Sequence, residues 1–409
     1  MFKFPININE NKVAYVLFSI LPISIIAGSA VLNILILFID LYFIFVIIKK
    51  KEAKILLNKI FILFILLWIL LMLNSILIAN TFDSFIRTFG FIRFIIFIFA
   101  FKFFFDGKLE FFKKYVLGFW FIIFLIVTID IFFEFFLGYN LLGFSSNYNG
   151  RIASFTGDEL KIGNYYFGFI LIALSYIYIY FNKYNKAYFY IFALIFLITS
   201  FIIGERSNFF KVLLMLTAFI FLINNQNYIK KILTIFIFLI ISSIIVSNNS
   251  FFKSRFIIEI LDPIREKGIN NFIKETKHGQ HFEIAKNIYS KNKIFGVGIK
   301  NFRSESKKIE YHSDRTLDQG ITTHPHQIHY EFLSETGLMG YSLFLLFFIF
   351  SIFIGLKKFF INRNNIFALS STLFLMATFL PILPSGSFFT SYSASIFWIN
   401  YIFLLKIKD

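Results

Sequence analysis

Apolar runs of about 20 residues, separated by short polar breaks, repeat along almost the whole sequence. This is the length that an α-helix needs to cross the hydrocarbon core of a bilayer. Hydrophobic residues form 58% of the chain, more than a soluble domain with a mixed surface contains. The pattern predicts an all-α, polytopic integral membrane protein with about 12 transmembrane helices. The expected spans are 12–29, 31–48, 60–79, 88–105, 115–137, 163–181, 187–203, 208–223, 232–247, 337–356, 366–383 and 388–405.

The positions of lysine and arginine predict the orientation, because cytoplasmic loops are enriched in these residues. If both termini are cytoplasmic, the inner segments hold clustered positive charges and the short outer loops hold scattered ones. The inner clusters include Lys49, Lys50, Lys51, Lys113, Lys114, Lys230, Lys231, Lys357 and Lys358, and the short outer loops hold Arg87, Arg151, Lys161 and Arg206. We therefore expect both termini in the cytoplasm, and we interpret the first apolar run as a retained helix.

One long polar stretch divides the chain into three regions. Residues 1–247 are expected to hold transmembrane helices 1–9, residues 248–336 a large periplasmic loop between spans 9 and 10, and residues 337–409 helices 10–12. The loop contains all six histidines. Its segment 281–293 reads as an amphipathic helix with Phe282, Ala285, Ile288 and Tyr289 on one face, whereas 305–320 is polar and reads as irregular.

Charge and composition exclude several classes of function. The net charge is +17, but the basic residues punctuate apolar runs and do not form a continuous basic face on a soluble domain. We therefore expect no nucleic-acid partner. The absence of cysteine excludes disulfides, thiolate metal sites and cysteine nucleophiles.

Two motifs lie near the end of the long loop: FGVGIKNFR at 295–303 and THPHQIHYEFLSETGLMG at 323–340. Gly296 and Gly298 permit a tight turn after the amphipathic helix. This pairing of G-V-G-x-x-x-F with H-P-H-x-x-x-x-E-x-x-x-E-x-G-x-x-G, directly before a membrane helix, resembles the signature loop of the O-antigen ligase and polymerase family. Members of that family join oligosaccharides that are carried on undecaprenyl diphosphate.

The resemblance implies a glycosyltransferase of the bacterial inner membrane, active at the periplasmic face and without a cofactor. Its partners would be an undecaprenyl-diphosphate-linked glycan, membrane lipids and a sugar acceptor. In a ligase the acceptor is the lipid A core, and in a polymerase it is a second lipid-linked glycan. The sequence does not separate these two reactions, because both need the same base, the same diphosphate site and the same access for lipid.

Motif positions carry the family's functional residues onto this chain. The catalytic histidine falls on His326, followed by Gln327 where many members have Asn, and the arginine at the outer end of a middle helix falls on Arg206 in GERSNFF. His281 occupies a position that is commonly Arg. The expected substrate-binding residues are Arg206, His324, His281, Arg151, Arg93 and Glu159.

The residue types suit this chemistry without the resemblance. Transfer of a sugar from a diphosphate to a hydroxyl needs a proton acceptor at the attacking oxygen and positive charge at the departing diphosphate. A neutral histidine accepts a proton near pH 7, and the arginine fork matches phosphate oxygens. His326 and Arg206 therefore form a plausible pair, whereas His312 lies among charged residues and is expected to be solvated.

Other interpretations stay open at this point. His324, His326 and His329 are spaced closely enough to suggest a metal site, although Pro325 opposes a regular helix and no zinc pattern matches. We expect no metal. Within the spans, Arg87 or Arg93 is expected to pair with Asp130 or Glu134, which would lock helices together. Alternatively, the arginines line a groove that admits the lipid diphosphate.

Two further classes of function compete with a transferase. The first is a transporter of lipid-linked oligosaccharide, for which charges inside spans such as Asp40 would also be suitable. The long histidine-bearing loop and the lack of two similar halves argue against it. The second is a membrane partner in envelope assembly without catalytic activity.

Overall fold

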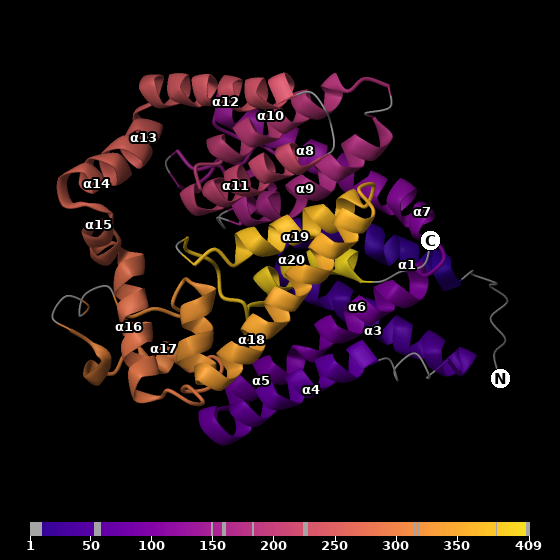
Figure 1. Ribbon diagram of the computed structural model, residues 1–409, viewed down its shortest axis with the longest axis vertical. Helices are drawn as coiled ribbons and strands as arrows, with labels where there is room; N and C mark the ends of the chain where they lie inside the picture. The colour runs from indigo at the N-terminus through magenta and orange to yellow at the C-terminus, as the bar shows by residue number, and fades with distance from the viewer. Residues whose placement is uncertain are drawn as a thin grey trace.

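The computed structural model describes residues 10–52, 59–148, 150–157, 161–181, 184–223, 228–313, 316, 320–381 and 383–405. These residues form a helical protein with no β-strand among them (Figure 1). The all-α prediction is thereby confirmed for the described part of the chain.

The first half of the chain contains α1 (Glu10–Ser19), α2 (Leu21–Ile26), α3 (Ser29–Lys50), α4 (Lys59–Asn74), α5 (Phe82–Gly90), α6 (Ile92–Phe105), α7 (Leu109–Phe111), α8 (Leu117–Leu137), α9 (Ile162–Tyr180) and α10 (Ala187–Ile202). The second half contains α11 (Arg206–Leu222), α12 (Tyr228–Asn248), α13 (Ser250–Lys253), α14 (Asp262–Lys267), α15 (Ile269–Glu275), α16 (Lys277–Lys291), α17 (Phe302–Glu305), α18 (Ile328–Ile361), α19 (Ile366–Thr378) and α20 (Ser391–Tyr401). Wider π-helical turns occupy Ser75–Ala79, Phe112–Val116 and Ser254–Leu261, and 3-10 turns occupy Ser154–Thr156, Ile309–Tyr311 and Ile402–Leu404.

Seven helical segments of the described residues are long and apolar enough to cross a membrane. They are Ser29–Lys50, Ile60–Ala79, Phe82–Phe105, Leu109–Leu137, Ile162–Tyr180, Tyr228–Asn248 and Ile328–Ile361. The shorter apolar helices α10 and α19 lie among them. The structure therefore supports a polytopic membrane protein, while the number of twelve spans remains a prediction.

The helices differ from the expected spans where proline interrupts the hydrogen-bond ladder. The first expected span is two helices, α1 and α2, with Pro22 in the first turn of α2. The last two expected spans are shorter than predicted, because α19 ends at Thr378 and α20 begins at Ser391. The chain between them contains Pro381 and Pro384. The connection is therefore longer than the 384–387 that the sequence pattern predicts, since the described residues between 379 and 390 are all non-helical.

Aromatic side chains fill much of the interior. Phe18 is completely buried and packs against the rings of Phe97 and Phe105 at 5.4 and 5.3 Å between centroids. The buried Trp120 satisfies its indole N–H by donating to the Phe18 carbonyl at 2.9 Å. Such pairing matters because a polar group left unpaired away from water is costly.

The carboxylates of α8 do not pair with the arginines as predicted. Asp130 accepts from the Leu141 N–H at 2.7 Å and from the Ser154 hydroxyl. Glu134 accepts from the N–H groups of Ala153 and Ser154. These carboxylates accept from the backbone of the irregular segment after α8, whose donors would otherwise lack partners. Arg87 and Arg93 both donate to the Ser391 hydroxyl at the start of α20 instead.

The helix α18 is broken at Gly337, and a segment of the long loop repairs the break. Gly337 has φ 63° and ψ −166°, a conformation that is essentially restricted to glycine. The carbonyls of Ser334 and Glu335, freed by the break, accept from the N–H groups of Val297 and Gly298 at 3.0 and 2.8 Å. The freed N–H groups of residues 338 and 339 donate to the carbonyls of residues 293 and 294 at 2.8 and 3.1 Å. Two backbone groups on each side of Gly337 are thus satisfied by one neighbouring segment.

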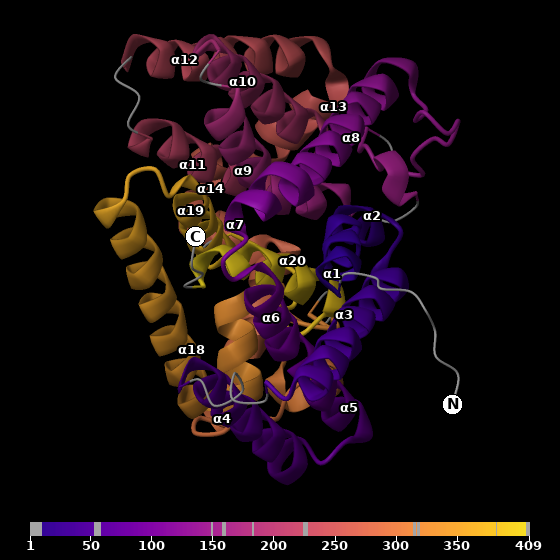
Figure 2. The same cartoon turned by 90° about the vertical axis from the view of Figure 1, so that its right-hand side faces the viewer.

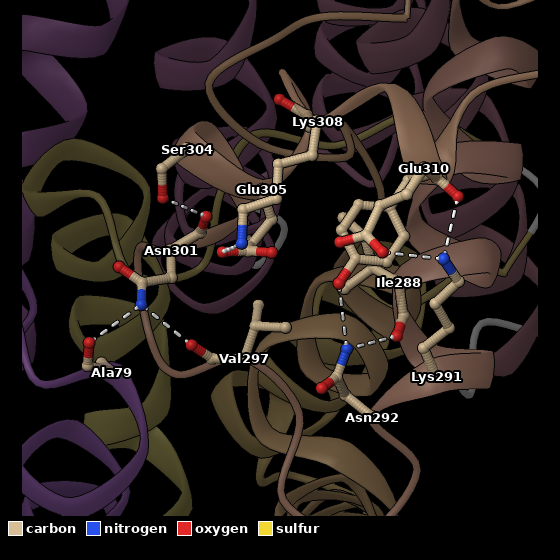
Figure 3. A network of polar contacts seen from close by, with 12 residues as sticks. Ala79, Ile288, Lys291, Asn292, Val297, Asn301, Ser304, Glu305, Lys308 and Glu310 are labelled. Atoms are coloured by element: carbon tan, nitrogen blue, oxygen red, sulfur yellow. Dashed lines mark hydrogen bonds and ion pairs between the residues drawn. The ribbon is translucent and has the colours of Figure 1, made fainter.

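Glycine is required on both sides of this backbone exchange. A Cβ at Gly337 would collide with the backbone of Ile294 and Gly296, and a Cβ at Gly296 would collide with that of Glu335. Asn301 fixes the same turn, since its amide donates to the carbonyls of Ala79 and Val297 at 3.2 and 2.9 Å (Figure 3). The two sequence motifs therefore form one unit of structure.

The long loop is largely helical and has a small core of its own. The predicted amphipathic helix is confirmed as α16, whose Ala285 and Ile288 are buried together with Ile284. Phe282 stacks on Tyr330 of α18 at 5.0 Å. Outside this core, the Lys291 ammonium contacts the Glu310 carboxylate at 3.0 Å (Figure 3). Upstream, α13, α14 and α15 form an arm that leads from α12 to α16 along one side of the molecule (Figure 1).

The histidine-bearing loop and several lysine clusters lie at opposite ends of the same helices. The helix α18 begins directly after the histidines and ends beyond Lys358, whose ammonium donates to the Leu404 carbonyl at 2.5 Å. Similarly, α11 begins at Arg206, and Lys231 donates to the Ile223 carbonyl beyond its other end at 2.9 Å. This separation agrees with the predicted charge asymmetry without fixing which side is cytoplasmic.

We predict that reporter fusions at Lys51, Lys113, Lys230 and Lys358 will read as cytoplasmic. These residues belong to clusters of positive charge, and such clusters are enriched in cytoplasmic loops. Fusions at Gly150 and Lys307 should read as periplasmic. Paired alkaline phosphatase and green fluorescent protein fusions measure both states. A cytoplasmic signal at Lys307 would contradict the orientation.

Gly337→Ala should lower the stability of the protein by about 2 kcal/mol or more, because alanine meets both a forbidden backbone conformation and fixed neighbouring backbone. Gly107→Ala is the matched control: Gly107 has φ 71°, but no atom lies within 4 Å of an added Cβ. Its expected loss is about 1 kcal/mol. Thermal unfolding of the purified proteins in detergent measures both, and equal losses would refute the proposed role of the backbone exchange.

Candidate functional site

Four histidine rings from two segments form one cluster. His278 and His281 come from the first turns of α16, and His324 and His326 come from the segment before α18. The ring of His326 lies in the middle: its centroid is 4.0 Å from His324, 5.1 Å from His278 and 5.1 Å from His281. His326, His324 and His281 were predicted site residues, and the fold adds His278 to them.

Local backbone structure holds these rings in place. The Thr276 hydroxyl accepts from the Gly279 N–H and caps α16 where its histidines begin. The Gln327 side chain caps α18 by accepting from the N–H groups of His329 and Tyr330. Between them, His326 has a left-handed backbone with φ 56°, which is uncommon outside glycine and is found frequently at functional sites.

Arg206 lies in a cluster of charged residues beside the histidines. Its guanidinium donates to the Arg255 carbonyl and contacts the Glu259 carboxylate, both at 3.0 Å. The Arg206 charge also acts on His278, where it contributes to lowering the pKa. Arg151 is close enough that its charge lowers the pKa of Arg206. Three arginines, from the loop before α9, the start of α11 and the arm, therefore share one region next to the histidine cluster.

A serine-rich loop, residues 383–390, connects Arg206 to His326. Ser207 and Lys211 of α11 both donate to the Pro384 carbonyl, at 2.5 and 2.7 Å. The next residue, Ser385, donates its N–H to the His326 carbonyl at 2.7 Å. Successive residues of one loop thus hold His326 and the first turns of the helix that begins with Arg206, although these lie far apart in the sequence.

The same loop is anchored to α18 through a buried carboxylate. Glu331 is 1% exposed and accepts from the Phe388 N–H at 2.7 Å and from the Ser387 hydroxyl. The Lys300 ammonium reaches the Ser387 hydroxyl from the motif turn at 3.4 Å. Buried and fully bonded, Glu331 is well suited to position the loop, because a buried carboxylate holds its donors strongly.

Burial keeps the clustered histidines neutral. Together with the adjacent rings of His324, His278 and His281, it lowers the pKa of His326 to about 2. Burial likewise lowers the pKa of His278 to about 4, helped by His281 and Arg206, and the pKa of His324 to about 4, helped by Lys300. Each charged imidazole would be close to other positive groups with little water to screen them. At neutral pH these rings are therefore proton acceptors.

The predicted substrate-binding residues divide into three groups. His324, His281, Arg206 and Arg151 lie in or beside the histidine cluster, as described above. Arg93 lies elsewhere, at the start of α20, where it donates to Ser391 at 2.9 Å. Glu159 lies outside the described residues.

Sequence reasoning missed three parts of this site. It did not select His278, although this residue precedes His281 by nearly one helical turn in a helix that was predicted. It did not select Glu205, a half-buried carboxylate that accepts from the Asn208 amide at 2.7 Å and lies next to Arg206 in sequence. It assigned residue 383 and residues 388–390, half of the serine-rich loop, to membrane spans, although the run of Pro, Ser and Gly was a signal for non-helical backbone.

The other two histidines have local structural roles. His312 was predicted to be solvated, and this was wrong: its ring is half-buried between the carbonyls of Ser306 and Thr316, at 2.7 and 3.1 Å. His329 bridges the Phe379 carbonyl and the Tyr341 hydroxyl at 2.8 and 3.1 Å. Among the described residues, no group of three or more His, Cys, Asp or Glu side chains is arranged to hold a metal ion.

Comparison with known proteins assigns no family to this chain, so the geometry of the site is the basis for proposing a function. The chain matches no protein-family model, and no curated protein matches it.

The histidine cluster should make stability depend on pH. An unfolded histidine has a pKa of about 6.5, whereas the folded pKa of His278 is about 4. Stability is therefore complete above pH 6.5 and is lost as the pH falls from about 6.5 towards 4, because the unfolded chain takes up protons that the folded chain does not. Melting temperatures between pH 7.5 and pH 4.5 measure this slope.

His278→Gln should reduce that slope, because one of the neutral buried rings is removed. The exposed neighbour Lys277 provides the matched control, and Lys277→Gln should leave the slope unchanged. An unchanged slope in His278→Gln would show that this ring is not held neutral in the folded protein.

Proposed function

We propose that this chain is a glycosyltransferase of the bacterial inner membrane. It would transfer a glycan from undecaprenyl diphosphate to a sugar hydroxyl at the periplasmic face, as an O-antigen ligase does with the lipid A core. The observation that carries the proposal is that one loop holds both His326 and the helix start that bears Arg206. A proton acceptor and a cationic group at one end of a membrane bundle are the two elements that this reaction needs.

In the proposed reaction, the acceptor oxygen forms a bond to the anomeric carbon while the bond from that carbon to the diphosphate oxygen breaks. His326 takes the proton of the attacking hydroxyl. Arg206, with Arg151 and Arg255 nearby, stabilises the negative charge that grows on the departing diphosphate. A bound diphosphate would also raise the low pKa of His326, because an opposite charge favours the protonated ring.

An apolar groove supports a lipid-linked donor. It lies between α4 and α18, which are seen in Figure 2, and has a volume of about 360 Å³. The lining is almost entirely hydrocarbon and includes Trp68, Phe91, Phe332, Phe344 and Phe388. Phe332 and Phe388 belong to α18 and to the serine-rich loop, next to the bonded pair of Glu331 and Ser387. A polyprenyl chain in this groove would have its polar end near the loop that holds His326.

An O-antigen polymerase is the alternative within the same chemistry. A transporter of lipid-linked oligosaccharide is favoured by a different observation: Asp40 is 2% exposed in α3, and neither carboxylate oxygen has a hydrogen-bond partner among the described residues. Ionisable groups of this kind often mark ion pathways in transporters. The Arg93 charge acts on Asp40, so a helix-locking role is equally open to this pair.

An assay with purified protein distinguishes these functions. The protein in nanodiscs receives an undecaprenyl-diphosphate-linked glycan, with either lipid A core or a second lipid-linked glycan as acceptor, in the presence of EDTA. A new glycosidic bond supports a transferase, and the acceptor that is used separates ligase from polymerase. Translocation without bond formation would replace the proposal with the transporter, and activity that requires an added divalent ion would favour the metal interpretation.

His326→Ala should lower the transfer rate by about 10²- to 10⁴-fold, the usual contribution of a general base. Arg206→Ala should lower it by about 10²- to 10³-fold. Arg303, which is exposed, gives the matched control, and Arg303→Ala should retain full activity. Rates are measured on variants with normal membrane insertion.

Two further variants sharpen this test. Arg206→Lys keeps the charge but removes the fork, so partial activity indicates a point-charge role and complete loss indicates bidentate binding. If His326→Ala is active and His324→Ala is inactive, the base is the other ring of the closest pair. Normal activity in both variants would remove the base mechanism.

A further inference from the structure

A second cavity lies at the lysine-bearing end of the bundle, far from the histidine cluster along α18. Its volume is about 280 Å³, and three parts of the chain enclose it. These are the end of α6 with α7 and the turn that follows, the connection from α18 to α19, and the final described turn of the chain. The proposed glycosyl transfer does not use this cavity.

One side of the cavity is cationic and rich in hydrogen-bond donors. Lys113 and Lys358 line it, together with the amide side chains of Asn362 and Asn365. Both amide oxygens are already occupied, since Asn362 accepts from the Asn364 N–H and Asn365 from the Ala368 N–H. The NH₂ ends of these amides are therefore the groups available to a ligand, and no acidic side chain lines the cavity among the described residues.

The other side of the cavity is apolar. Phe101, Phe112, Phe367 and Phe403 contribute rings, and Leu109 and Ile402 contribute aliphatic side chains. The start of α19 also lies at this cavity, where the helix dipole adds partial positive charge to that of the lysines. A ligand that fits both sides needs a compact anionic group joined to hydrocarbon.

Lys113 is able to serve such a ligand although it has a partner. Its ammonium contacts Glu110 at 2.6 Å, but the Glu110 side chain is 75% exposed. Exposed ion pairs of this kind contribute little, and an ammonium offers three donors. The apolar groove between α4 and α18 provides a contrast, because its lining contains almost no polar group and offers nothing to an anionic head group.

We propose that this cavity binds the phosphate head group of an anionic phospholipid, with the adjoining acyl chain against the aromatic side. Basic pockets between membrane helices are suited to this ligand, and each lysine near an anionic lipid surface contributes attraction. A bound lipid would join three distant parts of the chain at the membrane surface. The proposal concerns lipid binding alone and stands independently of the proposed function.

The sequence provides two matched pairs of lysines for the test. Lys113 lines the cavity while its neighbour Lys114 is exposed, and Lys358 lines it while Lys357 is exposed. Within each pair, replacement by glutamine removes the same charge from the same end of the bundle. Binding that depends on the cavity affects one member of each pair, whereas general electrostatic attraction affects both members equally.

The experiment measures binding of phosphatidylglycerol and of phosphatidylcholine to the full-length detergent-purified protein by native mass spectrometry. Phosphatidylglycerol should bind, and Lys113→Gln should weaken its binding about fivefold, as expected for one lysine. Lys114→Gln and Lys357→Gln should bind like the unchanged protein. Because Lys358 also contacts the Leu404 carbonyl, Lys358→Arg is included to keep the charge, and it should retain binding if Lys358→Gln loses it.

Three results would overturn the proposal. Equal binding of phosphatidylcholine would show that the anionic head group is not recognised. Equal weakening by Lys113→Gln and Lys114→Gln would show that the attraction is general. Displacement of the lipid by millimolar inorganic phosphate would show that the cavity takes a free anion and that the apolar side has no part in binding.

Discussion

The backbone exchange at Gly337 is the interaction on which the rest of the outer structure depends. A break inside an apolar helix leaves carbonyl and N–H groups that no lipid can satisfy. The segment 293–298 supplies partners for two carbonyls and two N–H groups at this break. It follows α16 directly, so the exchange also fixes α16 against α18. His278 and His281 lie at the start of α16, and His324 and His326 lie just before the start of α18. Fixing the two helices against each other therefore brings the two pairs of histidines together.

A second constraint is the satisfaction of polar groups in a chain with few of them. Non-helical backbone at membrane depth is tolerated where protein buries it and supplies partners. The serine-rich loop meets this condition: Ser207 and Lys211 bond Pro384 on one side, and Glu331 bonds the following residues on the other. Because Ser207 and Lys211 belong to α11 and Glu331 belongs to α18, the loop fixes the positions of these two helices relative to each other. The positions of Arg206, at the start of α11, and of His326, just before α18, follow from the relative placement of these helices.

Local patterns in the sequence were sufficient to predict the helices, the amphipathic segment α16, and the importance of the glycine motifs. The candidate roles of His326, Arg206 and His281 came from the motif positions of the family resemblance, and these roles remain predictions. The pairing of arginines with the carboxylates of α8 was wrong for a physical reason. Those carboxylates accept hydrogen bonds from the backbone of a loop, and the hydropathy pattern does not show which loop folds back onto a helix. His278 and the serine-rich loop were missed in the same way, since their neighbours come from remote segments.

The clustered histidines are held neutral, mainly by burial, and positively charged arginines lie beside them. Burial, with smaller contributions from His281 and Arg206, lowers the pKa of His278, and burial together with the neighbouring histidine rings lowers the pKa of His326 to about 2. Such a ring is a weak base in the empty site. An anionic ligand between the arginines and the rings would reverse the balance, because its charge favours the imidazolium. Under the proposed function, the diphosphate is that ligand. The donor would then raise the basicity of the ring that must accept the proton, so that proton transfer becomes favourable when the donor is bound.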